Sequence, residues 1–135
     1  MDEASLNLSR HRLQNAEETL DEAEYNFKGE KYKASLNRSY YAVFNAMRAV
    51  NALEGFDSKK HSGVRSYFMQ HFIKTGKIKR ELSSIVTETI KFREKADYDD
   101  FYVVKISDVE EQLQNAKKFV QEISVFLDMQ NEEME

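Results

Sequence analysis

Arg38 and Asn45 are the polar side chains whose types and spacing most directly suggest chemistry in this chain. They are seven residues apart, so in a helix they lie almost above one another, because each residue turns the helix by about 100°. A guanidinium can hold a phosphate group and stabilise negative charge that develops on it. An amide can orient a phosphate or a water molecule, but it has no pKa suited to proton transfer.

The predicted helix around this pair has two faces. One is an apolar stripe expected to face a bundle core, formed by Leu36, Tyr40, Val43, Met47 and Val50. Arg38 and Asn45 lie roughly 180° from this stripe, among Ala34, Tyr41, Ala42 and Ala49. Because small side chains let another surface approach closely, we expect a second, buried or half-buried polar face. The alternative is that alanine is simply a good helix former and that Arg38 is solvated.

His61 is the next candidate, within the segment Lys59-Lys60-His61. It is expected in the first turn of a helix, where backbone N–H groups and two lysines favour an anion. His61 can then complete a phosphate site, or carry a proton if its helix leans over that of Arg38. The alternative is a histidine that caps or packs a helix junction. Gly63, inside the same predicted helix, indicates a close backbone contact.

Arg93 falls on the inward face of a later predicted helix, where a charge needs a partner. Asp97, four residues on, is the expected structural pair. The functional alternative has Arg93 reach the polar face beside Arg38. Asp97, Asp99 and Asp100 lack the glycine turn and terminal Glu of a calcium loop, so we predict no metal site. No glycine-rich phosphate loop is present, and we predict no cofactor.

Five helices are expected to position these residues, near 8–28, 30–53, 59–74, 79–96 and from 107 onward. Gly29, Gly55 and Gly76 each follow an amphipathic segment, where a left-handed glycine easily ends a helix. A capping-box sequence from Ser107 to Glu110 opens the last helix. Short links imply an all-α, up-and-down four-helix bundle with the shorter third helix across it. We expect one domain over 1–135, with its core at about 8–127 and a frayed acidic tail at 130–135.

Composition supports a helical protein of the cytoplasm. The 135 residues include no Cys and no Pro, so disulfides and thiolate metal sites are excluded. No apolar run approaches the roughly 20 residues that span a bilayer, and the N-terminus is acidic where a signal peptide would be basic. We therefore expect a cytoplasmic protein with no membrane partner.

Charge is unevenly distributed along the chain. The formal net charge is −4, yet residues 59–95 carry 10 basic and 3 acidic side chains. Such a segment can offer a local phosphate-binding surface, and Lys74, Lys77, Lys79 and Arg80 form one possible RNA contact. Lysines that are merely solvated would give the same count.

The chain resembles the HEPN family (higher eukaryotes and prokaryotes nucleotide-binding) in three blocks that occur in the family's order. These are Asn-Arg-Ser-Tyr-Tyr-Ala-Val-Phe-Asn-Ala at 37–46, Lys-Lys-His-Ser-Gly-Val at 59–64 followed by Phe68, and Arg93 with Ala-Asp-Tyr at 96–98. The resemblance covers roughly residues 8–127, and the small stand-alone bacterial and archaeal members are the most similar branch.

The resemblance implies a possible nuclease. Family members thought to cut RNA carry an Arg and a His with about four to six residues between them, and two copies meet across a dimer cleft. Here Arg38 matches the Arg, but Asn45 stands where the His is expected. The implied activity is a metal-independent endoribonuclease in which Arg38 binds the scissile phosphate and His61 or Tyr41 replaces the missing His. Lys59, Lys60, His61 and Arg93 are the further expected RNA or nucleotide contacts.

The resemblance also implies partners, and Asn45 leaves an alternative open. Family members are commonly paired with a small nucleotidyltransferase in toxin–antitoxin modules, where the HEPN protein is the RNase toxin. We therefore expect a homodimer, RNA or a nucleotide, and a nucleotidyltransferase antitoxin as partners. The alternative is a non-catalytic dimeric helical module that binds a nucleotide or a protein, since the amide of Asn45 argues against catalysis.

Overall fold

The computed structural model describes residues 2–134, which form five α-helices and one π-helical segment. The elements are α1 (Glu3–Lys28), α2 (Tyr32–Ala52), α3 (His61–Phe68), its continuation η1 (Met69–Ile73), α4 (Leu82–Tyr98) and α5 (Ile106–Met134). No strand occurs between residues 2 and 134, so the all-α prediction is confirmed. Each of the helices in this range is too short or too polar to cross a bilayer.

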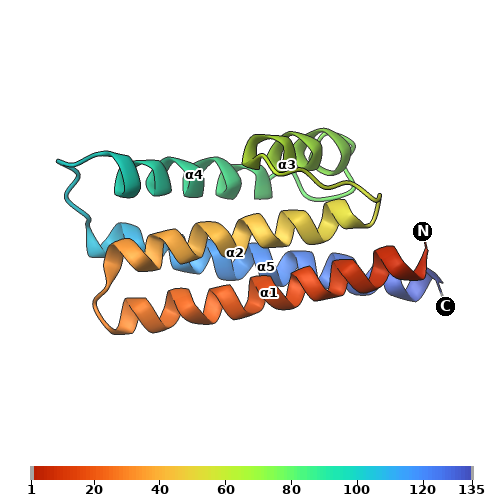
Figure 1. The fold of residues 1–135 in the computed structure, drawn as a ribbon, viewed down its shortest axis with the longest axis horizontal. Coiled ribbons are helices and arrows are strands. Elements are labelled where there is room, and N and C mark those ends of the chain that lie inside the picture. Colours follow the sequence, from red (N-terminus) through yellow and green to blue (C-terminus); the bar gives the residue numbers. More distant parts are fainter. Residues whose placement is uncertain (1, 135) are drawn as a thin grey trace.

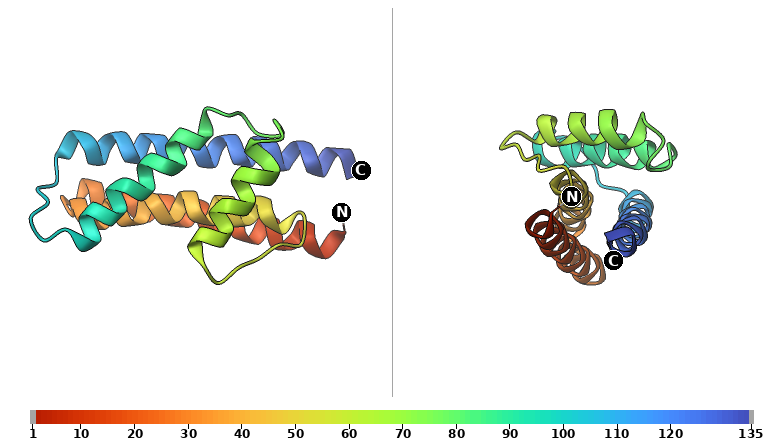
Figure 2. Two further views of the ribbon diagram at one scale, coloured as in Figure 1. Left: turned by 90° about the horizontal axis from the view of Figure 1, so that it is seen from above. Right: turned by 90° about the vertical axis from the view of Figure 1, so that its right-hand side faces the viewer.

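The four long helices run alternately up and down, as Figure 1 shows. Seen end-on, α1, α2 and α5 form a triangle, and α3 and α4 cover one side of it (Figure 2). α1 and α2 share the most extensive interface of the bundle. The predicted four-helix arrangement, with the shorter third helix packed across it, is confirmed.

The predicted apolar stripes make the core. All five stripe residues of α2 are buried, and so are six of α5, namely Val109, Leu113, Ala116, Val120, Ile123 and Leu127. Phe68 of α3 meets Phe119 of α5 with their ring centroids 5.8 Å apart, and both side chains are fully buried. Each large apolar side chain contributes about 1.5–3 kcal/mol on burial, so this core fixes which face of α2 points outward.

The opposite face of α2 is covered over much of its length by α1 of the same chain. Ala42 and Ala49 are fully buried. The hydroxyl of Ser9 donates to the carbonyl of Ala49 at 2.7 Å. Small side chains at a contact allow two helix axes to approach closely. A surface does approach this face, but along Ala42–Ala49 it is α1 and not a second copy of the chain.

Helix ends match the predictions in part. Gly55 and Gly76 have left-handed φ angles of 72° and 80° as expected, whereas near the end of α1 the left-handed residue is Glu30, with φ 62°. The N–H of Gly29 still donates to the carbonyl of Tyr25, so the turn falls one residue later than predicted.

The predicted ends of the last helix also need correction. α5 begins at Ile106, because the N–H groups of Asp108 and Val109 both donate to the carbonyl of Lys105. Ser107 is therefore inside the first turn, and the predicted capping box is wrong. α5 continues to Met134, so residues 130–134, predicted to fray, are helical. Glu135, the last residue of that predicted tail, lies outside the described residues.

Candidate functional site

Arg38 lies near the start of α2, where Ala34 is exposed and the polar face remains open. Its Nε and one terminal nitrogen donate to Oδ1 of Asn37 at 3.1 and 2.8 Å. Its guanidinium carbon lies 4.9 Å from the centroid of the Tyr41 ring, a cation–π distance. None of the ion pairs between residues 2 and 134 involves Arg38. Its charge is therefore available to an anion.

Arg93 of α4 reaches the same aromatic side chains. Its guanidinium carbon lies 4.9 Å from the centroid of the Tyr40 ring and 5.8 Å from that of Tyr41. Its Nε lies 3.1 Å from Oδ2 of Asp97, in an ion pair that is not aligned as a hydrogen bond. Arg93 thus pairs with Asp97, and its guanidinium and that of Arg38 both lie within 5.8 Å of the centroid of the Tyr41 ring.

His61, the first residue of α3, completes the cluster. Its Nδ1 lies 2.8 Å from the hydroxyl of Tyr40, and its ring centroid lies 4.1 Å from that of Phe44. Burial, together with the charges of Arg93 and Arg48, lowers the pKa of His61 below its ordinary value of 6.5. At neutral pH the imidazole is therefore uncharged and can accept a proton.

Two hollows border the cluster. The His61 pocket has a volume of about 160 Å³ and is lined by residues that include Tyr40, His61, Arg65, Arg93 and Glu94. The Arg38 groove has a volume of about 520 Å³ and is lined by residues that include Asn26, Lys33, Asn37, Arg38 and Asp97. Sequence reasoning missed Arg65, although its spacing of four from His61 places both on one face of α3.

The two lysines before α3 add positive charge beside the pocket. Lys59 and Lys60 are exposed, and the backbone N–H of Lys60 donates to the hydroxyl of Ser58 at 3.2 Å. The two lysines and the arginines that line the two hollows outnumber the carboxylates that line them, which are Glu94 and Asp97. The surface is therefore suited to a polyanion, because clustered cations raise the local concentration of negative ligands.

Asn45 is not part of this cluster. Its amide nitrogen donates to the hydroxyl of Thr19 on α1 at 3.3 Å. The two positions share one face of α2, but seven residues of helix separate Asn45 from Arg38 by about 10 Å along the axis, and α1 covers the part that holds Asn45. Within one chain, Arg38 therefore lies with Tyr41, Arg93 and His61, whereas Asn45 bonds to α1. The expected site that combines Arg38 and Asn45 across a dimer stays a prediction.

The fold and the site together describe an all-helical protein with a cationic surface built around aromatic rings. A family model described as the HEPN domain matches residues 9–126. A UPF0332 protein of Thermotoga maritima is 34% identical over 113 residues, which cover 84% of this chain and 80% of that protein. A protein of Methanocaldococcus jannaschii named "Putative toxin MJ0142" is 30% identical over 119 residues, 88% of this chain and 81% of its own. The chain belongs to the HEPN domain family.

Proposed function

We propose that this chain is a toxin-type HEPN protein that binds RNA through Arg38, Tyr41, His61 and Arg93, here called the arginine–tyrosine surface. The observation that carries the proposal is the convergence of two arginines from different helices on one tyrosine, beside an uncharged histidine. The names of two relatives, "Putative toxin MJ0142" and "Putative toxin MJ0605", support the toxin class.

Each part of this surface has a role in holding a phosphodiester chain. Guanidinium groups bind phosphate oxygens through paired N–H donors, and Arg38 has no carboxylate partner to displace. Aromatic rings such as Tyr41 can stack on exposed bases. Lys59 and Lys60 extend the cationic path along the start of α3 and would bind neighbouring phosphates.

In the nuclease form of the proposal, His61 replaces the absent motif histidine. Its neutral imidazole accepts the proton of the ribose 2′-hydroxyl as the 2′ oxygen attacks phosphorus. The bond from phosphorus to the 5′ oxygen breaks, and the leaving oxygen takes a proton from water. Arg38 stabilises the charge that develops on the phosphate. The products are a 2′,3′-cyclic phosphate and a free 5′-hydroxyl.

A second candidate function is a non-catalytic module that binds RNA, a nucleotide or a protein. The observation in its favour is the hydrogen bond from Asn45 to Thr19, since it occupies the residue that stands in for the motif histidine. This candidate predicts binding at the arginine–tyrosine surface without turnover.

The proposed partners in the cytoplasm are a second copy of the chain and a nucleotidyltransferase antitoxin. Three apolar side chains at the end of α4 and in the following connection are exposed, Tyr98 at 73%, Phe101 at 93% and Val103 at 80%. Asp97, which lines the Arg38 groove, immediately precedes them. Several exposed apolar side chains close together in the sequence support a protein interface beside the groove.

Binding of a labelled single-stranded RNA, measured by fluorescence anisotropy, tests the proposal. We expect Arg38→Ala to weaken binding about tenfold or more, which corresponds to a loss of about 1.4 kcal/mol. Arg10→Ala, which removes an exposed arginine from α1, is the matched control and should bind as the wild type does. Equal binding by folded Arg38→Ala and wild type would refute the proposal.

A denaturing gel of the same mixtures separates the two candidate functions. RNA fragments that appear with the wild type, but not with Arg38→Ala or His61→Ala, would establish the nuclease. Binding without fragments would establish the non-catalytic module.

A further inference from the structure

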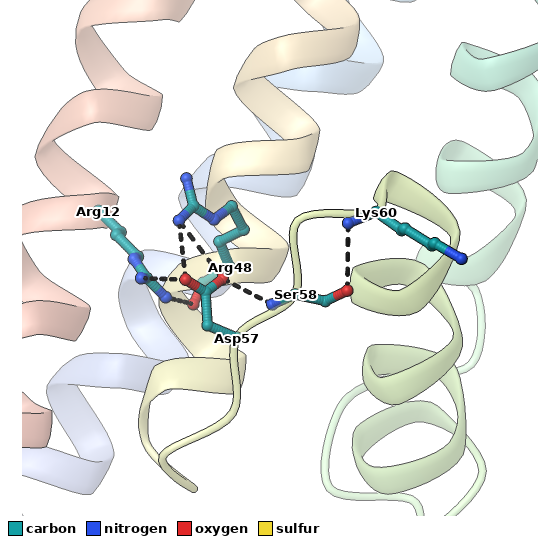
Figure 3. Close-up of polar contacts among 5 residues, drawn as sticks. All are labelled: Arg12, Arg48, Asp57, Ser58 and Lys60. Atoms are coloured by element: carbon teal, nitrogen blue, oxygen red, sulfur yellow. Dashed lines mark hydrogen bonds and ion pairs between the residues drawn. The ribbon is translucent and has the colours of Figure 1, made fainter.

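Asp57, in the connection between α2 and α3, is held by two arginines from different helices, as Figure 3 shows. Its Oδ2 lies 3.1 Å from a terminal nitrogen of Arg12 and 3.3 Å from one of Arg48. Arg12 also donates to the backbone carbonyl of Arg48 at 3.4 Å. A single carboxylate thus joins α1, α2 and the connection that leads to α3.

The charges of this cluster depend on one another. Burial acts to raise the pKa of Asp57, but the N–H of Ser58 and the two guanidiniums outweigh it, and the pKa is lowered. Asp57 is therefore ionised at neutral pH. Arg12 is only 9% exposed, and Nε of Arg48 is buried without a hydrogen bond among the residues described. Removal of Asp57 would leave both guanidiniums without their carboxylate, and the cost should fall mainly on Arg12, because the side chain of Arg48 is 32% exposed.

A short series of contacts connects Asp57 to His61. Oδ1 of Asp57 accepts from the N–H of Ser58 at 2.9 Å, and the hydroxyl of Ser58 accepts from the N–H of Lys60 at 3.2 Å. His61 is the next residue. Gly63 allows this arrangement, because a Cβ atom there would lie 2.5 Å from the hydroxyl oxygen of Ser58. The close contact expected at Gly63 is therefore confirmed, and it fixes the path of the connection against α3.

We propose that the Arg12–Asp57–Arg48 cluster is a latch that positions His61 at the RNA-binding surface, with Asp57 as a positioning residue. This inference rests on the proposed function of that surface. Asp57 touches none of the surface residues and acts through Ser58 and the backbone of Lys60.

Arg48 also couples the latch to the charge on His61. The titratable and charged groups that face His61 are Tyr40, Tyr41 and Arg48 from α2, Arg65 from α3, and Arg93 and Glu94 from α4. Of these, Arg48 is the group that Asp57 neutralises. Without Asp57, the uncompensated Arg48 would disfavour the imidazolium more strongly, and the pKa of His61 would fall further.

NMR titration of the His61 ring in the full chain tests the latch without any RNA. We expect Asp57→Asn to shift the ring signals and lower the pKa of His61, and Asp57→Glu to restore both in large part. Asp21→Asn, which removes an exposed carboxylate between α1 and α5, is the control and should leave the His61 signals unchanged. Unchanged His61 signals in folded Asp57→Asn would overturn the latch.

Gly63→Ala is the second variant, and it keeps every charge in place. Its added methyl group must displace Ser58, so we expect the His61 ring signals to move as well. Unmoved signals in this variant would overturn the latch even if Asp57→Asn fails to fold.

RNA binding of the same variants separates this inference from the proposed function. We expect Asp57→Asn to weaken RNA binding about tenfold while Asp21→Asn binds as the wild type does. Shifted His61 signals in a protein whose wild type binds no RNA would support the latch and overturn the proposed function. If the His61 signals of Asp57→Asn do not move, and the wild type binds RNA through Arg38, the latch is overturned and the proposed function is supported.

Discussion

The arginines near the site differ in how their charge is compensated, and neither Arg38 nor Arg65 forms an ion pair among residues 2–134. Arg93 has Asp97 beside it, and Arg12 and Arg48 share Asp57. Arg38 instead has the neutral side chains of Asn37 and Tyr41 as its contacts. A phosphate that reaches Arg38 displaces no carboxylate, so the binding free energy is not reduced by breaking an ion pair. We therefore expect Arg38 to bind phosphate more readily than Arg93, whose guanidinium is paired with Asp97.

The lowered pKa of His61 gives the fold a defined pH dependence. The unfolded chain takes up a proton near pH 6.5, whereas burial first, and then Arg93 and Arg48, make the folded state resist protonation. The free energy of unfolding should therefore decrease as the pH falls through 6.5, and level off below the lowered pKa of the folded state. Above that range His61 contributes nothing to the pH dependence.

Urea denaturation of the wild type and His61→Gln over this pH range checks the prediction. The substitution should reduce the loss of stability at low pH. His11→Gln, which removes an exposed histidine of α1, is the control and should keep the wild-type profile. Identical profiles for His61→Gln and the wild type would show that the imidazole is not held in the way described.

At the level of helices, periodicity predicted which faces are apolar but not which neighbour covers the remaining faces. The stripes of α2 and α5 were identified correctly from spacing, since burial follows the helical repeat. The same repeat placed Arg38 and Asn45 on one face. It does not show how much of that face is covered by α1. Only the structure shows that Asn45 bonds to α1 while Arg38 stays open.

The coverage of α2 by α1 predicts unequal effects of two similar substitutions. Ala49→Leu would insert a large side chain where the alanine is fully buried, and should destabilise the fold by about 1–3 kcal/mol. Ala34→Leu lies on the same helix at an exposed position and should change stability by less than about 0.5 kcal/mol.

Chemical denaturation at two protein concentrations measures both effects. The loss in Ala49→Leu should not depend on concentration, because the contact lies within one chain. A loss that disappears on dilution, or equal effects of the two substitutions, would contradict coverage by α1.

At the level of the whole molecule, the fold brings together basic residues that the sequence distributes over three helices. The chain has a net charge of −4, but Arg38 lines a groove between α1, α2 and α4, and Arg65 and Arg93 line a pocket between α2, α3 and α4. The excess of basic residues between 59 and 95 indicated such a surface. The charge excess could not indicate that Asp57 and Arg48, which lie outside that segment, position the start of α3. Contacts across the bundle leave no periodic signal in the sequence.

NMR mapping shows whether RNA binds the arginine–tyrosine surface. A labelled sample of the full chain is titrated with a short single-stranded RNA, and the shifted signals are assigned to residues. We expect the largest shifts on Arg38, Tyr41, His61 and Arg93. Shifts confined to another region, such as the basic turn from Lys74 to Arg80, or no shifts at all, would contradict this expectation.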